Sequence, residues 1–159
     1  MPQPLILKKS DGFYEIPLFE EFNARALFTT REKSINGSKL VSPTQVHGDS
    51  VYCAEAAGAS GEADAPVPEA DALITRCRNI PLAIRTADCL PVFLLDTSRR
   101  AIAMIHAGWK GMRKKIISKT IKQMEIKFLT GPSELIAVLG PAIRPCCYEV
   151  GEEFRGYFD

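Results

Sequence analysis

The stretch Ala-Ile-Ala-Met-Ile-His-Ala-Gly-Trp-Lys-Gly, residues 101–111, predicts a buried strand that turns directly into a helix. Its apolar part, Ala101–Ile105, is short and directly follows an arginine, which is typical of a buried strand inside a layered domain. Strand alternation places His106 on the same face as Ile102 and Met104, at the end of the strand. We therefore expect the imidazole to lie where the strand gives way to the helix.

The segment after this turn carries the clearest helical pattern of the chain. Between residues 112 and 128 the apolar residues recur at spacings of 4, 3 and 4. These spacings place four side chains on one stripe of a helix, namely Ile117, Ile121, Met124 and Phe128. Gly131-Pro132 is predicted to end the helix, and a further helix is expected to begin near Gly151.

Other short apolar runs predict the remaining strands. Three runs with sharp boundaries lie at Ile80–Ile84, Val92–Leu95 and Leu135–Leu139, and two nearer the start lie at Leu5–Leu7 and Ala26–Phe28, with Asp11-Gly12 as a turn between them. Residues 54–68 are rich in alanine, glycine and proline and predict a surface loop. Strands mixed with a helix indicate an α/β layered fold.

The composition is ordinary for one globular domain spanning residues 1–159, with 46% hydrophobic and 25% charged residues. The formal net charge is +1, which provides no field to attract nucleic acid or an acidic membrane surface. No apolar stretch approaches the roughly 18 residues of a membrane span, and the start lacks the pattern of a signal peptide. We expect a cytoplasmic protein with no nucleic-acid or membrane partner, while the oligomeric state stays open.

The five cysteines have no C-x-x-C spacing and are odd in number, which argues against a disulfide framework and favours a reducing compartment. Cys146 and Cys147 are neighbours, and a trans peptide holds their Cα atoms about 3.8 Å apart, closer than in an ordinary disulfide. We predict that both are free thiols.

Three side chains suggest a metal centre. The chain has only two histidines, His47 in Gln-Val-His-Gly and His106 in His-Ala-Gly-Trp, and Cys89 lies in a short connection before Pro91. Catalytic zinc sites use three protein ligands and leave one position open for water or substrate. Separations of 42 and 17 residues do not prove that the three meet, and a loop histidine or a buried small cysteine remains the alternative for each.

Several neighbouring residues have two interpretations each. Asp88 could orient a ligand or move a proton, or it could simply be a turn residue. The amides from Gly108 to Gly111, with Lys110 and Arg113, could hold phosphate, or the glycines could only form a tight turn with solvated basic side chains. Trp109 could stack on a ligand or pack at the rim of the core.

Five ordered motifs resemble one known family. The motifs are Gln45–Gly48, Ala70–Thr75, Thr86–Pro91, Ile105–Trp109 and the pair Gly140–Ile143 with Tyr148–Gly151. Together they resemble the purine nucleoside phosphorylases once labelled multicopper polyphenol oxidoreductases or laccase-domain (YfiH-like) proteins. The match runs from about Gln45 to the end of the chain, and this family continues well past Asp159.

The resemblance implies an α/β fold with mixed sheets and packed helices, similar to the cytotoxic-necrotizing-factor cysteine hydrolases. It implies Zn²⁺ held by His47, Cys89 and His106, phosphorolysis of adenosine, inosine and methylthioadenosine, and deamination of adenosine to inosine. The partners are then a purine nucleoside and phosphate. We take Cys89, Asp88 and His106 as candidate catalytic residues. Candidates for binding nucleoside or phosphate are Arg31, Arg85, Gly108, Lys110, Gly111, Arg113 and Glu149.

Two rival functions stay open, and a third is excluded by residue counts. Cys89 could be the nucleophile of a metal-free hydrolase that acts on an amide such as a peptidoglycan precursor, with either histidine as its base. The chain could also be a catalytically impaired paralogue. A coupled copper oxidase needs more imidazoles than two histidines supply.

Overall fold

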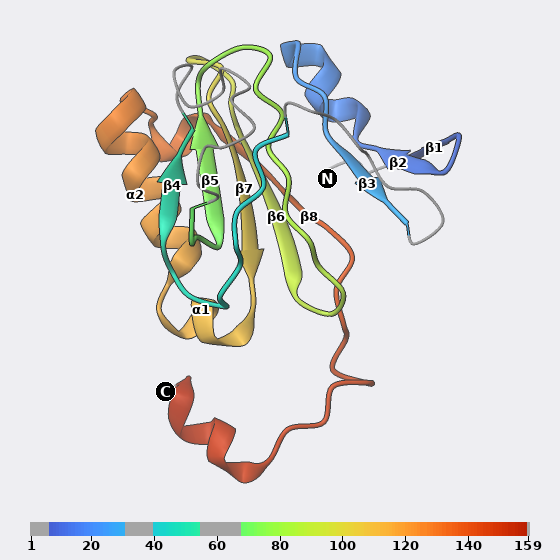
Figure 1. Cartoon of the computed structure of the whole chain (residues 1–159), viewed down its shortest axis with the longest axis vertical. Helices are drawn as coiled ribbons and strands as arrows, with labels where there is room; N and C mark the ends of the chain where they lie inside the picture. Colours follow the sequence, from blue (N-terminus) through green and yellow to red (C-terminus); the bar gives the residue numbers. More distant parts are fainter. Residues whose placement is uncertain (1–6, 31–39, 55–67, 159) are drawn as a thin grey trace. The chain divides into compact units, whose positions relative to one another are not determined.

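Strand β7 (Ile102–Ala107) lies at the centre of a five-stranded mixed sheet in a computed structural model that describes residues 7–30, 40–54 and 68–158. The sheet has the order β4-β5-β7-β6-β8, with β4 (Val51–Cys53), β5 (Ala72–Thr75), β6 (Leu90–Asp96) and β8 (Leu135–Leu139). The pair β4–β5 is parallel, and the other pairs are antiparallel (Figure 1). The predicted α/β layered fold with a mixed sheet and a packed helix is confirmed.

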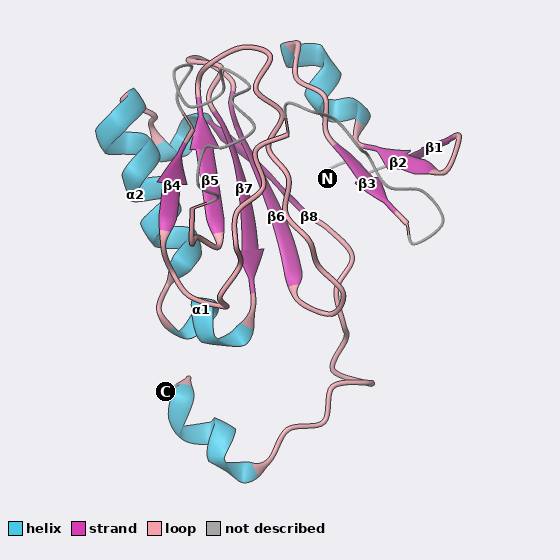
Figure 2. Ribbon diagram, in the orientation of Figure 1, coloured by secondary structure: helices cyan, strands magenta, loops and turns pink. Residues whose placement is uncertain are grey.

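Both faces of this sheet are apolar, and helix α2 (Ile116–Phe128) covers one of them (Figure 2). The inward side of α2 presents Ile116, Thr120, Met124 and Phe128, which are buried, while the predicted Ile117 and Ile121 are half-buried at its edge. These side chains of α2 pack against Ala72, Ile74, Ala103 and Ile105 from the central strands β5 and β7. The predicted positions Met124 and Phe128 are confirmed. At the start of the helix the buried positions lie one residue earlier than predicted, at Ile116 and Thr120.

The predicted continuous helix from residue 112 is wrong at its start. A short helix, α1 (Trp109–Arg113), follows β7, and Lys115 then adopts a left-handed conformation with φ of 61° before α2 begins. Residues 112–115 are all exposed, so no pattern of buried positions in the sequence marks the break between α1 and α2. At its other end α2 stops at Phe128, and Leu129 follows in a left-handed conformation with φ of 59°, two residues before the predicted Gly131.

The predicted strand at Ile80–Ile84 is wrong. In this segment only Leu82 forms an isolated bridge, to Val41. Ile80 and Leu82 are nevertheless buried, because the extended segment packs against Leu73 on the sheet face opposite α2. An apolar run reports burial, and here burial is achieved without a strand ladder.

The chain divides into two compact units, residues 1–38 and 39–159. The described part of the first is an antiparallel sheet of β1 (Lys8–Ser10), β2 (Phe13–Glu15) and β3 (Leu27–Thr29), with a 3₁₀ helix at Pro17–Phe22. Asp11-Gly12 forms the predicted turn, and β3 overlaps the predicted run at Ala26–Phe28. Most of the run Leu5–Leu7 and of the predicted loop at 54–68 lies outside the described residues.

Two further 3₁₀ helices lie at Pro132–Glu134 and Glu152–Tyr157, and the second agrees with the helix expected near Gly151. Among the described residues, no helix combines the length and the hydropathy that a membrane crossing requires. The prediction of one domain over residues 1–159 stays a prediction.

Candidate functional site

His106 is placed by the register between β5 and β7. These strands pair Ala72 with Ile105, so one step further Asp71 faces His106. The amide of His106 donates to the carbonyl of Asp71 at 2.7 Å, which continues the ladder beyond the strand. The imidazole is only 3% exposed. The sequence had predicted a histidine at the strand exit, and the ladder now supplies an acidic neighbour for it.

Cys89 is placed by the register between β6 and β7. Leu90 pairs with Ala107, so Cys89, in the bend just before β6, faces Gly108. A Cβ atom on Gly108 would lie 3.2 Å from the Cys89 Sγ and 3.3 Å from the His47 Cδ2. Glycine at this position therefore leaves room for the three side chains to meet.

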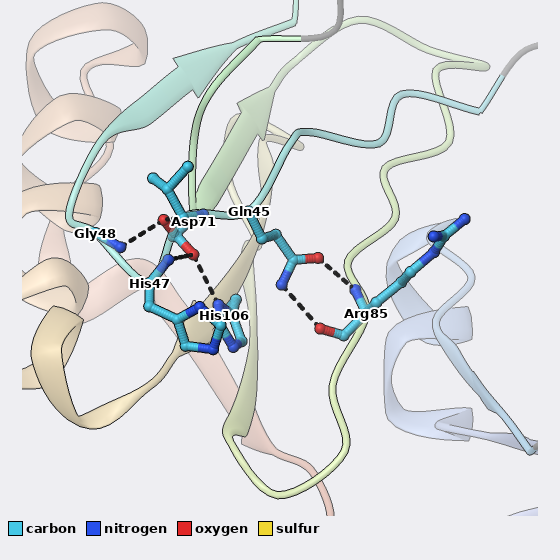
Figure 3. A network of polar contacts seen from close by, with 7 residues as sticks. Gln45, His47, Gly48, Asp71, Arg85 and His106 are labelled. Carbon is cyan, nitrogen blue, oxygen red and sulfur yellow. Dashed lines mark hydrogen bonds and ion pairs between the residues drawn. The ribbon is translucent and has the colours of Figure 1, made fainter.

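His47 reaches the same place from a loop whose backbone is anchored by Asp71. Its φ of 56° lies in the left-handed region, which few residues other than glycine adopt. Three consecutive amides, those of Val46, His47 and Gly48, donate to the Asp71 carboxylate at 3.2, 3.0 and 2.7 Å. Figure 3 shows the contacts of His47 and Gly48 with Asp71. The turn and the orientation of His47 thus depend on one buried acid.

The structure brings His47, Cys89 and His106 together. Their ligand atoms all lie within 4.8 Å of one another, and the two imidazole centroids are 4.7 Å apart at an interplanar angle of 83°. His47 is exposed, Cys89 is half-buried and His106 is buried. The group therefore extends from the core to the surface and is open to a small molecule on its His47 side.

This donor set fits a zinc ion. Two imidazoles and one thiolate are ligands that zinc accepts, with bonds of about 2.0–2.3 Å, so tetrahedral ligand atoms lie about 3.5 Å apart. The ligand atoms lie within 4.8 Å of one another, and the exposed His47 is the member of the group whose side chain is least restricted by burial. The Nδ1 atom of His106 is hydrogen-bonded to Asp71 Oδ1 at 2.7 Å, which leaves Nε2 to face a cation.

Asp71 is the site residue that sequence reasoning missed. It belongs to a quoted motif but received no role, although an acid directly before a fully buried strand was the available signal. Burial alone would raise the pKa of its carboxyl, but the hydrogen bonds from His106, Gly48 and Val46 outweigh burial and hold the pKa below its ordinary value. Asp71 is therefore a buried carboxylate that accepts hydrogen bonds and donates none.

The environment of Cys89 bears on the rival hydrolase. Burial raises the pKa of its thiol, and the nearby Asp88 and Asp71 carboxylates raise it further. A cysteine nucleophile needs the opposite environment, because the thiolate is the reactive form. A bound cation would reverse this effect and stabilise the thiolate.

The predicted phosphate-binding residues have other partners in the structure. Arg85 engages the Gln45 side chain through its backbone, with hydrogen bonds of 2.7 and 2.8 Å, and its guanidinium points away from the two imidazoles (Figure 3). Lys110 lies over the Trp109 ring, and Arg113 over the Tyr157 ring, at 5.6 and 4.5 Å from the centroids. Their binding roles stay predictions.

The remaining candidate site residues lie at the surface or outside the described residues. Asp88 and Glu149 are exposed, and Arg31 lies outside the described residues. Asp88 accepts a backbone hydrogen bond from Ile143 at 3.0 Å, which ties the Cys89 bend to the segment after β8. Trp109 packs with Phe154 and Tyr157 from the last 3₁₀ helix, so its ring has the rim-packing role that was the alternative to ligand stacking.

Gly111 provides a prediction about packing beside the site. A Cβ atom there would lie 2.6 Å from the backbone oxygen of Gly48, in the loop that carries His47. Gly111→Ala should therefore destabilise the fold by about 1–3 kcal/mol, because neither α1 nor the loop can move without repacking. Urea unfolding measures the change.

Gly156→Ala is the matched control, since a Cβ atom on Gly156 meets nothing within 4 Å in the described part of the chain. This variant should be as stable as the unsubstituted protein. A Gly111→Ala protein that is no less stable than Gly156→Ala would contradict the close approach of α1 to the His47 loop.

Sequence comparison places these observations among known proteins. The family model described as multi-copper polyphenol oxidoreductase laccase matches residues 22–159. A purine nucleoside phosphorylase of Aquifex aeolicus is 38% identical over 120 residues, which is 76% of this chain and 53% of that protein. Another, of Rickettsia conorii, is 35% identical over 152 residues, or 96% of this chain and 57% of that protein.

Two solved structures share the fold. YlmD of Geobacillus stearothermophilus aligns with a TM-score of 0.67 at 29% identity, covering 76% of this chain and 46% of that one. YfiH of Bacillus licheniformis aligns with a TM-score of 0.66 at 32% identity, with the same coverage of 76% and 46%. The chain thus spans about half the length of the relatives that it matches.

Proposed function

Because the chain belongs to the multi-copper polyphenol oxidoreductase laccase family, and curated relatives carry the name purine nucleoside phosphorylase, we propose that it splits purine nucleosides with phosphate. One observation carries this proposal: His47, Cys89 and His106 converge on one point that is open to solvent at His47. A site with three ligands and an open side is the arrangement of a catalytic zinc centre.

Each residue near the site has its own role in the proposed reaction. His47, Cys89 and His106 would hold zinc, which would supply Lewis-acid chemistry at the site. Asp71 keeps the imidazole of His106 oriented through its Nδ1 atom. The exposed His47 side would admit the nucleoside, and Lys110 and Arg113, the basic residues of α1, would receive phosphate after leaving their aromatic partners.

Phosphorolysis needs no other reactant. A phosphate oxygen forms a bond to C1′ of the ribose as the bond from C1′ to the purine nitrogen breaks, and the departing purine takes up the proton that hydrogen phosphate gives up. We propose adenosine, inosine and methylthioadenosine as substrates. We also propose deamination of adenosine, in which water replaces the amino group at C6 and ammonia leaves, with Asp88 or Glu149 moving the proton.

Copper oxidase chemistry is not part of the proposal, despite the family name. The whole sequence holds two histidines, and coupled copper sites need more imidazoles. Cys146 and Cys147 are free thiols, as predicted, which supports a reducing, cytoplasmic location.

Product analysis tests the proposed reaction. The zinc-loaded protein is incubated with adenosine, with and without phosphate, and adenine is resolved from inosine by chromatography. We expect adenine and ribose 1-phosphate only when phosphate is present. Inosine should form in both samples and be split in part to hypoxanthine when phosphate is present.

The remaining outcomes identify the rivals. Amide hydrolysis by protein stripped of metal would favour the cysteine hydrolase. A zinc-loaded chain without turnover, beside an active full-length relative under the same conditions, would show that this chain is impaired.

A further inference from the structure

We propose that Asp71 is the positioning residue of this centre and that one carboxylate aligns two of the three zinc ligands. It would fix which nitrogen of His106 faces the cation, and it would hold the backbone turn that aims His47. The inference rests on the proposed function for the identity of the cation.

The contact with His106 sets the imidazole. Nδ1 of His106 lies 2.7 Å from Asp71 Oδ1, and the two side chains are 3% and 0% exposed. A carboxylate can only accept, so the neutral imidazole keeps its proton on Nδ1 and leaves the Nε2 lone pair free. Without this partner either nitrogen could carry the proton, and Nε2 would be available as a ligand in only one of the two tautomers.

The contact with the His47 loop sets the second ligand. Left-handed conformation is costly for a residue with a side chain and persists only when its surroundings enforce it. Here the amides of Val46 and Gly48 converge on Oδ2, and the amide of His47 donates to Oδ1. Since Oδ1 also receives His106, any change at Asp71 disturbs both histidines at once.

Asparagine at position 71 is nearly isosteric but cannot satisfy these donors. If its oxygen faces His47 and His106, its amide nitrogen points at the N–H groups of Val46 and Gly48. If the amide is turned over, its nitrogen faces the amide of His47 and forces the His106 proton onto Nε2, which removes that atom as a ligand. In both orientations a buried N–H group faces another donor instead of an acceptor.

A second buried aspartate provides the matched control. Asp96 is also 0% exposed, and its Oδ1 accepts the amides of Ser98 and Arg99 at 2.8 Å each. Its Oδ2 has no hydrogen-bond partner within the described residues. Asparagine can therefore place its nitrogen at the Oδ2 position and keep both contacts.

The test compares zinc affinity in Asp71→Asn, Asp96→Asn and unsubstituted protein by competition with a chromophoric chelator. We expect Asp71→Asn to bind zinc about 10–100-fold more weakly. Asp96→Asn should match the unsubstituted protein. Equal affinity in Asp71→Asn and Asp96→Asn would overturn the proposal.

A measurement on the unsubstituted, metal-free protein covers the case in which Asp71→Asn does not fold. Nitrogen-15 NMR at alkaline pH reports the tautomer of each imidazole, and only two histidines need assignment. We expect His106 to carry its proton on Nδ1. A proton on Nε2 would refute the role of Asp71.

Neither measurement uses a nucleoside, so failure of phosphorolysis leaves both results interpretable. Conversely, unsubstituted protein that binds no zinc would refute the zinc-dependent part of the proposed function. The His106 tautomer would still report on Asp71.

Discussion

Replacement of His106 by alanine is expected to abolish both zinc retention and nucleoside turnover. His106 is the buried member of the three candidate ligands and the one whose ring contacts Asp71, so its loss leaves an exposed histidine and a half-buried thiol. Loss of Lewis-acid catalysis costs several kcal/mol, which corresponds to a fall of about 10³-fold or more in kcat/KM. Elemental analysis after dialysis and the phosphorolysis assay measure the two effects.

Met104→Ala controls for damage to the strand, because Met104 lies on the same face of β7 two residues earlier and is half-buried. It shortens a packed side chain without removing a ligand, so zinc should stay bound in stoichiometric amount. Stoichiometric zinc in His106→Ala would contradict the assignment of His106 as a ligand.

Zinc is expected to stabilise the folded protein strongly. A ligand at about a thousandfold excess over its Kd adds about 4 kcal/mol to the free energy of unfolding when it binds only the folded state. For a domain of this size the gain corresponds to an increase in Tm of about 8–16 °C. Differential scanning calorimetry, with zinc added and then removed by a chelator, measures the shift.

Two controls make the shift specific to the site. Magnesium prefers oxygen ligands, so it should leave Tm unchanged. Cys89→Ala removes the single sulfur ligand and should lose most of the zinc response. A shift of equal size in Cys89→Ala would place the zinc elsewhere on the chain.

Much of the fold could be predicted because its strands are short apolar runs with sharp ends. The prediction at Leu135–Leu139 coincides with β8, and the runs at 92–95 and 101–105 lie largely within β6 and β7. The same rule failed at Ile80–Ile84, because side chains can be buried by an extended segment that does not join the ladder. It also missed β4, whose three residues are each half-buried.

The candidate site could be predicted only in part. His47, Cys89 and His106 were identified because histidine is scarce in this chain and each motif carries a turn signal. Asp71 was missed because its role depends on partners 23 to 35 residues away along the chain. Its place directly before the apolar run at 72–74 is the one local signal, and an ordinary turn residue can occupy the same place.

Local pattern therefore sufficed for the family resemblance, for the layered fold and for the list of possible ligands, since these follow from residue type and short-range spacing. The meeting of the three ligands required long-range pairing. The β5–β7 register sets Asp71 against His106, the β6–β7 register sets Cys89 against Gly108, and a left-handed turn held by Asp71 brings in His47. A slip of one residue in either register would turn these side chains to the opposite face of the sheet.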